Sequence, residues 1–347
     1  MTQRETPSSD PRLEALACWL SGLPGEFNLQ PASLHSASDD ASFRRYFRLS
    51  ARHEAATSLV VMDAPPPQED CRPFIHAAAV MGEAGLSVPR VLAADVDQGF
   101  LLLDDFGSLT YLQALNEQTA PVLYREACVA LVRLQVASRA GVFPAYDRAL
   151  LARELDLYPQ WYVERHRQVT LDDDDRNTLQ EAFELLITDA LAQPAVFVHR
   201  DYHSRNLMVL PGESNPGVLD FQDAVHGPYT YDLVSLLRDA YVSWPEEQVL
   251  DLAIRHWERA RKAGLPMPHA FGDFYRQFEW MGLQRHLKVL GIFARLSHRD
   301  GKDRYLADLP PVLEHVLKTA SRYRHFGRLA QVIERVEQRT RQTGYTF

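Results

Sequence analysis

The segment from residue 199 to residue 223 gathers the polar residues that could carry out chemistry. Asp201 follows an apolar run, Asn206 comes five residues later, and Asp220 follows a second apolar pair. The letters PGESNPG between them predict a tight turn, so a short hairpin would bring the three side chains together. Phosphoryl transfer to a hydroxyl needs a carboxylate that accepts a proton and oxygen ligands for Mg²⁺, and this set supplies both.

The same residues also have a purely structural interpretation. A single Asp or Asn in a turn usually forms the turn or caps a helix. The combination of His199, Asp201, Asn206 and Asp220 at these spacings favours catalysis over that interpretation. A nucleotide-binding protein that keeps the motif without catalysing a reaction stays an alternative.

The motif resembles that of kinases. The loop HRDYHSRN matches H-x-D-x-x-x-x-N, and LDFQD stands at the position of D-F-G. The continuation GP and YDLVSLLRD is similar to the aminoglycoside phosphotransferase and choline kinase superfamily. Within it, DASFRRYFRL, LLLDDFG and HRDYHSRNLM resemble the anomeric amino-sugar kinases of bacterial cell-wall recycling. The resemblance implies an α+β, two-lobed, protein-kinase-like fold, with a nucleotide-binding lobe of antiparallel sheet (1–104) and a larger, mostly helical lobe (105–347).

The resemblance also implies roles for individual residues. Asp201 would be the catalytic base, and Asn206 and Asp220 would hold Mg²⁺. Structural support of the loop is expected from His199 and Asp232, and contacts with the acceptor are expected from Tyr202 and His203. The implied reaction moves the γ-phosphoryl group of ATP to the anomeric hydroxyl of N-acetylmuramate or N-acetylglucosamine. Other acceptors within the superfamily (an aminoglycoside, choline or an amino alcohol) would share every catalytic residue.

The nucleotide phosphates need a covering loop and a cation. Residues 38–50 predict a strand, a tight turn and a strand, in which Ser42, Arg44 and Arg45 are the expected nucleotide contacts. The loop has no glycine, so a surface hairpin with solvated arginines is the alternative. The first lysine of the chain is Lys262, so the first lobe lacks the lysine that related kinases carry there. Arg44, Arg45 and Arg48 are the expected replacements, and an inactive protein is the alternative.

Further elements of the first lobe follow from local patterns. Asp10 and Pro11 predict the start of a helix, and Gly25 and Pro31 are expected to bound a short connection. We predict strands at 58–62 and in two runs within 88–103, with a helix at 74–84 between them. Asp105 and Phe106 would then form the hinge that meets adenine, although a simple turn explains them equally well.

The remainder predicts helices with apolar stripes, including 124–137, 176–190, 246–263, 273–296 and 311–338. The aromatic cluster Tyr158, Trp161 and Tyr162 could line a sugar pocket, but core packing is the favoured interpretation. The acidic run 172–175 is interpreted as a helix cap and solvated turn.

A basic face marks the helix at 273–296. Arg285, Lys288 and Arg295 lie at spacings that place them on one side. Arg285 and Arg295 could bind the carboxylate of an acidic sugar, since guanidinium groups hold carboxylates in bidentate fashion. A solvated basic surface is the alternative. A cationic acceptor, such as an aminoglycoside or choline, would need an acidic pocket instead.

The composition is that of a globular protein without a nucleic-acid partner. The chain has 347 residues, a formal net charge of −9 and no basic tail. Its three cysteines are scattered, which is typical of a reducing compartment and of neither a disulfide framework nor a zinc site. No apolar run is long enough to span a membrane, and the polar N-terminus does not resemble a signal peptide. We therefore expect a cytoplasmic protein, and we expect it to be a monomer. The resemblance implies that its ligands are a nucleotide and an amino sugar.

Overall fold

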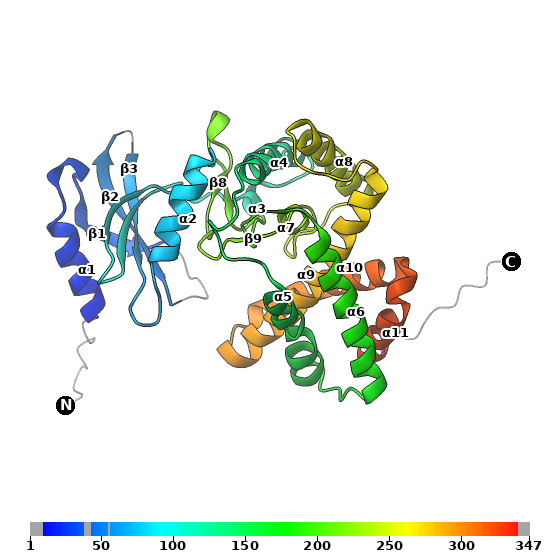
Figure 1. Cartoon of the computed structure of the whole chain (residues 1–347). Helices are drawn as coiled ribbons and strands as arrows, with labels where there is room; N and C mark the ends of the chain where they lie inside the picture. Colours follow the sequence, from blue (N-terminus) through cyan, green and yellow to red (C-terminus); the bar gives the residue numbers. More distant parts are fainter. Residues whose placement is uncertain (1–9, 38–42, 55, 339–347) are drawn as a thin grey trace, which may run out of the picture. The chain divides into compact units, whose positions relative to one another are not determined.

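The computed structural model describes residues 10–37, 43–54 and 56–338, and the chain divides into two compact units (Figure 1). The first unit contains residues 1–108 and 210–222, and the second contains residues 109–209 and 223–347. The chain therefore passes from one unit to the other after residues 108, 209 and 222. A single boundary at residue 104 stays a prediction.

The first unit is built on a five-stranded sheet with the order β1-β2-β3-β5-β4. The strands are β1 (Gln30–Ser36), β2 (Arg45–His53), β3 (Ala56–Asp63), β4 (Val91–Asp95) and β5 (Phe100–Asp104). Every neighbouring pair is antiparallel, and Val60 lies opposite Leu103 in the middle of the sheet. The antiparallel sheet expected for the first lobe is confirmed.

Two helices cover the two faces of this sheet (Figure 1). Helix α1 (Pro11–Ser21) begins where the sequence predicts, since the Asp10 side chain accepts hydrogen bonds from the amides of Arg12 and Leu13. Its Leu16 and Leu20 join β-strand residues, Leu49 and Leu59 among them, in one buried cluster. On the other side, α2 (Arg72–Glu83) packs Phe74 against Phe221, with ring centroids 4.7 Å apart. The segment 210–222 of this unit also contains the short β8 (Gly217–Val218).

One boundary expected in the first unit is shifted. The connection expected between Gly25 and Pro31 ends before Pro31, because β1 begins at Gln30. Proline is tolerated there because β1 is an edge strand, which has neighbours on one side only. Of the strand–turn–strand expected at 38–50, the second strand is confirmed as part of β2, and residues 38–42 lie outside the described residues.

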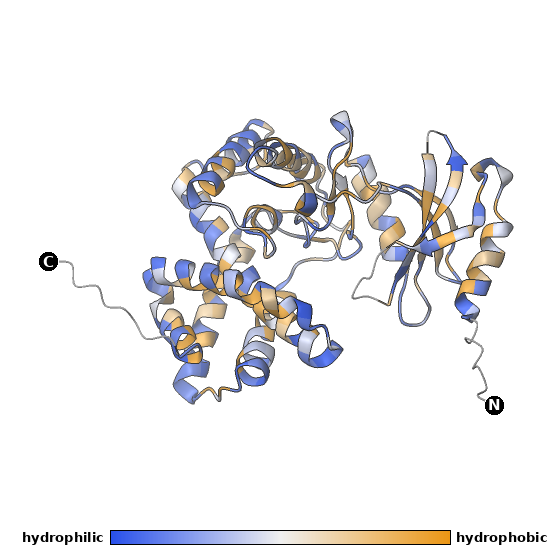
Figure 2. Cartoon of the chain, turned by 180° about the vertical axis from the view of Figure 1, so that it is seen from behind, coloured by the Kyte–Doolittle hydropathy of each residue, from blue (hydrophilic) through white to orange (hydrophobic). Residues whose placement is uncertain are grey.

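The second unit is mostly helical. Its main elements are α3 (Tyr111–Ala114), α4 (Ala120–Val136), α5 (Arg148–Leu155), the π-helix η2 (Tyr158–His166), α6 (Asp173–Ala192), β6 (Ala195–Val198), β7 (Leu207–Met208), β9 (Val225–Pro228), α7 (Tyr231–Leu237), α8 (Glu246–Lys262), α9 (Phe271–Asp300), α10 (Leu309–Arg322) and α11 (Gly327–Val336). Its helices turn their hydrophobic faces inward (Figure 2).

Helix α9 is the centre of this unit. It packs against α6, α7, α10 and η2, and most residues from Phe274 to Ser297 are buried. Polar and charged residues belong to this buried set, including Gln284, Arg285 and Lys288. A helix that is covered on nearly all sides must satisfy these groups internally, because unpaired buried charges are costly.

Local details of the helices refine the sequence predictions. Tyr158 and Tyr162 stack in the interior with centroids 5.6 Å apart, so core packing is confirmed for both. The helical tail expected at 311–338 is divided, because α10 ends at Arg322 and a short 3₁₀ helix (Arg324–Phe326) precedes α11. Asp172 caps α6 as predicted, but Asp175 is buried in an ion pair with Arg335 and is not part of a solvated turn.

Candidate active site

The loop that carries Asp201 is fixed at its start by a strand pair and a carboxylate. β6 pairs with β9, with Val198 opposite Val225, which sets where the loop leaves the strand. Asp232 then accepts hydrogen bonds from the amides of His199 (2.7 Å) and Arg200 (2.9 Å). These bonds hold Arg200 at a φ of 77°, a conformation that side chains rarely adopt. Burial raises the pKa of Asp232 to about 7, although both amide donors lower it.

The supporting role expected of His199 has a clear geometric basis. Its ring is fully buried, and Nδ1 accepts a hydrogen bond from the amide of Asp201 at 3.2 Å. The ring also lies edge-on to Tyr202, 5.7 Å between centroids. The imidazole thus orders the backbone directly at the candidate catalytic residue.

The far end of the loop is held just as firmly. Ser204 donates from its amide and its hydroxyl to Asp239, at 2.9 and 2.5 Å. Asn206 donates from its side-chain Nδ2 to the carbonyl of Asp201 at 3.0 Å. Because the amide nitrogen points to the loop, the amide oxygen is the Asn206 atom with the chemistry to meet a cation.

Asp201 itself combines solvent access with a strongly positive environment. Its side chain is 42% exposed, and Oδ1 lies 3.6 Å from Nη2 of Arg285. Burial raises the pKa of Asp201, but the charges of Lys288 and Arg285 outweigh it and lower the pKa to about 2. The carboxylate is therefore ionised at neutral pH and can accept a hydrogen bond from a hydroxyl.

A buried network of charges lies behind the loop. Glu154 of α5 pairs with Arg200 and with Lys288, whose Nζ is 2.9 Å from Oε1. Lys288 also donates to the hydroxyl of Tyr231 at 2.9 Å, and Tyr146 donates to Glu154. Burial raises the pKa of Glu154, but both cations outweigh it and the pKa is lowered. The network ties α5 and α9 to the residue that precedes Asp201.

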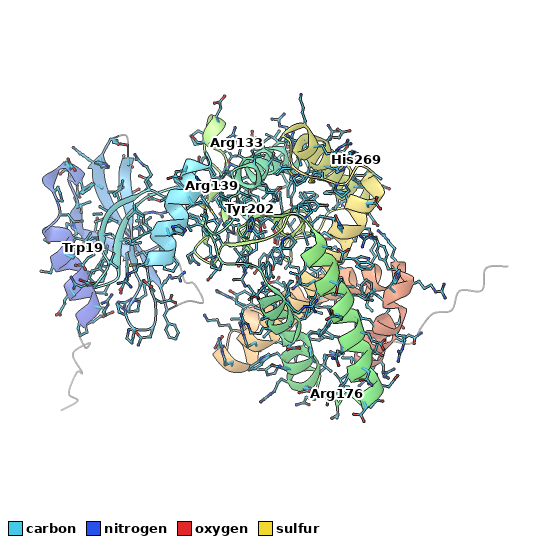
Figure 3. The ribbon with its side chains drawn as sticks, viewed as in Figure 1. Trp19, Arg133, Arg139, Arg176, Tyr202 and His269 are labelled. Carbon is cyan, nitrogen blue, oxygen red and sulfur yellow. The ribbon has the colours of Figure 1, made fainter. Side chains whose placement is uncertain are left out.

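The four expected acceptor contacts fall in different environments. Tyr202 is fully buried and donates to the carbonyl of Ala127 at 2.9 Å, so its geometry argues against a direct acceptor contact (Figure 3). The ring of His203 packs on Tyr241, and burial lowers its pKa. Arg295 follows Arg285 by ten residues, or about 15 Å along the helix, so one carboxylate cannot bind both.

The arginines expected to contact nucleotide phosphates all have carboxylate partners within the first unit. Arg44 pairs with Glu69 at 2.9 Å, and Arg45 pairs with both Asp63 and Asp10, at 2.6 and 2.5 Å. Arg48 donates two hydrogen bonds to Asp105. Ser42 lies outside the described residues. Nucleotide contacts at these positions stay predictions.

The remaining candidates of the first unit are Phe106 and Asp220. The Phe106 ring packs so closely on Gly217 that a Cβ atom there would lie 2.7 Å from it. It also borders a cavity of about 830 Å³ formed with α2, β4 and the turn after Leu210. Asp220 has a φ of 63° and accepts a hydrogen bond from Gln222 at 2.9 Å. Because Asp220 belongs to the first unit and Asp201 to the second, the three-residue cluster stays a prediction.

The donor set fits a magnesium ion better than a transition metal. An Asn oxygen and an Asp carboxylate are hard ligands, which leave the other positions of Mg²⁺ to phosphate oxygens and water. Within residues 10–37, 43–54 and 56–338, no three His, Cys, Asp or Glu side chains are grouped so as to hold a metal. Within the same residues, no helix has the length and hydropathy to cross a membrane.

Sequence reasoning missed several residues that shape this site. Glu154, Tyr146 and Ser235 gave no signal, because each occupies an ordinary position in a helical or turn pattern. Only the tertiary structure shows that Glu154 is buried between two cations. Lys288 was noted for its place on a basic face, and its burial could have been suspected from the apolar residues on either side of it.

The fold and the loop define a kinase-like phosphotransferase, and comparisons with known proteins agree. A profile of the phosphotransferase enzyme family matches residues 33–271. The chain belongs to this family, and it is therefore a phosphotransferase, for which ATP is the expected phosphoryl donor.

Relatives of known function are similar over nearly the whole chain. An N-acetylmuramate/N-acetylglucosamine kinase of Pseudomonas aeruginosa is 50% identical over 95% of this chain and 98% of its own. A protein of the same name from Neisseria meningitidis is 48% identical over 90% of this chain and 93% of its own.

Solved structures share the fold. A choline/ethanolamine kinase family protein of Mesorhizobium loti has a TM-score of 0.58 at 16% identity, covering 93% of this chain and 99% of its own. An aminoglycoside phosphotransferase in complex with gentamicin has a TM-score of 0.57 at 14% identity, covering 89% and 97%. The kinase-like fold expected from the sequence is confirmed.

Proposed function

We propose that the chain transfers the γ-phosphoryl group of ATP to the anomeric hydroxyl of N-acetylmuramate and N-acetylglucosamine in peptidoglycan recycling. The acceptor is inferred from the names of relatives that are 50% and 48% identical over nearly the whole chain. The observation that carries the chemistry is Asp201, an ionised and solvent-accessible carboxylate on a loop that is fixed at both ends.

Asp201 orients the acceptor hydroxyl and accepts its proton during transfer. An anomeric hydroxyl is more acidic than an ordinary alcohol, so a carboxylate of low basicity suffices. Asn206 and Asp220 would hold the metal ion through their side-chain oxygens. Mg²⁺, when bound, neutralises charge on the nucleotide phosphates, which is the main requirement of phosphoryl transfer.

The proposal extends to the state of the enzyme in the cell. Cys18, Cys71 and Cys128 are all free thiols, which fits the reducing cytoplasm. The proposal also takes the protein to act as a monomer.

ADP release from Mg-ATP tests the proposal. N-acetylmuramate, N-acetylglucosamine, kanamycin, choline and no acceptor are compared with the purified chain, and NMR of the product locates the phosphate. We expect turnover with the two amino sugars and a phosphate on the anomeric carbon. Turnover with kanamycin or choline alone would show that the amino sugars are not the acceptors. ATP binding without turnover on any acceptor would favour an inactive nucleotide-binding protein.

A further inference from the structure

Arg285 is the charged side chain in direct contact with the Asp201 carboxylate, and it is almost completely buried. Its side chain is 5% exposed, at the middle of the central helix α9. Nε donates to the hydroxyl of Ser235 at 2.5 Å, and the guanidinium carbon lies 5.8 Å from the centroid of the Tyr231 ring. Both partners belong to α7, the helix whose Asp232 holds the start of the catalytic loop.

The exposures of the two charges are opposite. The Asp201 carboxylate is open to solvent at 42%, whereas the guanidinium that faces it is covered. A side chain that binds the carboxylate of a substrate must present its donors to the pocket. Nε of Arg285 donates to Ser235 and Nη2 faces Asp201, so only a small part of the guanidinium is open to an acceptor.

The distance between the two groups also matters. At 3.6 Å the contact is longer than a hydrogen bond, so it attracts the carboxylate without saturating its oxygens. Lys288, one turn along α9, differs because Glu154 and Tyr231 occupy its ammonium group. Arg285 is thus the cation that can set the orientation of Asp201 and leave an oxygen for the acceptor hydroxyl.

We propose that Arg285 is a positioning residue that holds the Asp201 carboxylate toward the acceptor hydroxyl and does not bind the acceptor itself. This inference rests on the proposed function, because it assigns Arg285 a part in the same reaction. It replaces the expectation that Arg285 binds the lactyl carboxylate of N-acetylmuramate. The two roles differ in what the enzyme loses when the guanidinium is removed.

Steady-state kinetics of Arg285→Gln and Arg285→Lys on both sugars separate the roles. We expect Arg285→Gln to lower kcat by about 100-fold on N-acetylmuramate and on N-acetylglucosamine alike, with little change in KM. Arg285→Lys should recover about tenfold of that loss, because it restores the charge without the fixed geometry. A rise in KM for N-acetylmuramate alone, with kcat retained, would overturn the inference.

A matched control and a double variant complete the test. Arg276→Gln removes another arginine of α9, which pairs with Asp189 at 2.6 Å, and should leave both kinetic constants near those of the unaltered enzyme. In the Asp201→Asn background, Arg285→Gln should lower kcat little further, because a residue that acts through the Asp201 carboxylate no longer has that group to position. A full and independent loss in that background would contradict the inference.

The outcome is separable from that of the proposed function. If the unaltered enzyme phosphorylates neither sugar, the proposed function fails, and the same comparison is made with the acceptor that it does use. A fall in kcat at unchanged KM on that acceptor still supports the positioning role. If Arg285→Gln does not fold, as judged by circular dichroism, Arg285→Lys decides: unchanged kcat with a raised KM would refute the role.

Discussion

Asp105 in the first unit and Asp201 in the second are both carboxylates that face an arginine, yet their surroundings differ. Asp105 is 4% exposed and accepts four hydrogen bonds, from Nε and Nη2 of Arg48, the hydroxyl of Ser58 and the amide of Gly107. Asp201 is ten times more exposed, and its arginine remains 3.6 Å away.

The pKa of each carboxyl group is lowered, although by different means. At Asp105 burial raises the pKa, and hydrogen bonds from Arg48 and Ser58 outweigh it. At Asp201 burial also raises the pKa, and the charges of Lys288 and Arg285 outweigh it. A low pKa alone therefore does not identify a reactive carboxylate. A reactive carboxylate also needs oxygens that remain open to a ligand, as those of Asp201 do and those of Asp105 do not.

The largest effect is expected at Asp201, whose carboxylate is open to a ligand. Asp201→Asn removes the charge and the proton acceptor, so we expect kcat to fall by about 1,000-fold or more. The protein should stay folded with a modest fall in melting temperature, because Asp201 makes no side-chain hydrogen bond that the structure records but its charge offsets those of buried Arg285 and Lys288. ADP release and thermal unfolding measure the two quantities. Near-normal turnover would remove Asp201 from the mechanism and end the contrast with Asp105.

Asp105, whose carboxylate accepts four hydrogen bonds, should show the reverse pattern, with a loss of stability and little loss of turnover. Asp105→Asn weakens bonds to a partly buried arginine, so we expect the free energy of unfolding to fall by about 2 kcal/mol. Turnover at 20 °C should stay within about threefold, because any hinge contact would come from the backbone. Urea unfolding and ADP release test this, with exposed Asp97→Asn as the control. A selective loss of turnover would give the Asp105 side chain a part in nucleotide binding.

At buried His256, neither hydrogen bonds nor opposite charges offset the effect of burial on the pKa. Neither ring nitrogen has a hydrogen-bond partner in the structure, and burial, with a contribution from Arg259, lowers its pKa to about 3. Between pH 6.5 and 3 the unfolded chain binds a proton that the folded one does not, so acidification destabilises the fold. Through His256 alone, the free energy of unfolding should fall by about 2 kcal/mol between pH 6.5 and 5.

Unfolding by urea at pH 7 and at pH 5 checks this prediction. His256→Leu should reduce the difference between the two free energies by the amount that this site contributes. The exposed His269→Gln should leave the difference unchanged (Figure 3). An equal pH dependence in all three proteins would show that His256 is able to gain a proton without unfolding.

The smallest effect concerns a pair on the surface. Arg148 and Glu184 lie 2.6 Å apart and are both more than half exposed. Water and salt screen such pairs, so Arg148→Ala should change the free energy of unfolding by less than about 0.5 kcal/mol. A loss as large as that of Asp105→Asn, measured by the same urea method, would show that exposure is a poor guide to the value of an ion pair in this protein.

Local patterns made much of the fold predictable. Asp10 and Pro11 specify the start of α1, and Asp172 specifies the start of α6, because capping depends on neighbouring residues alone. The position of β1 could not be predicted in this way, since Pro31 is acceptable only at a sheet edge. Which strand lies at the edge is decided by tertiary pairing.

The candidate site was predictable to a similar extent. Spacing and residue type identified the loop around Asp201, because one short segment contains most of it. The partners of that loop are distant in sequence: Glu154 lies before it, and Arg285 lies on a helix far behind it. A basic residue on a helix usually faces solvent, and only the burial of the middle of α9 makes Arg285 and Lys288 part of the interior.

The division of the chain between the two units has a consequence for its synthesis. The first unit needs residues 210–222, which follow about a hundred residues of the second. All five strands of its sheet have left the ribosome long before this last piece is made, so the unit is completed only after residue 222 has been translated. A protein that is cut after residue 108, or assembled from two halves at that point, separates the sheet from the segment that contains Asp220.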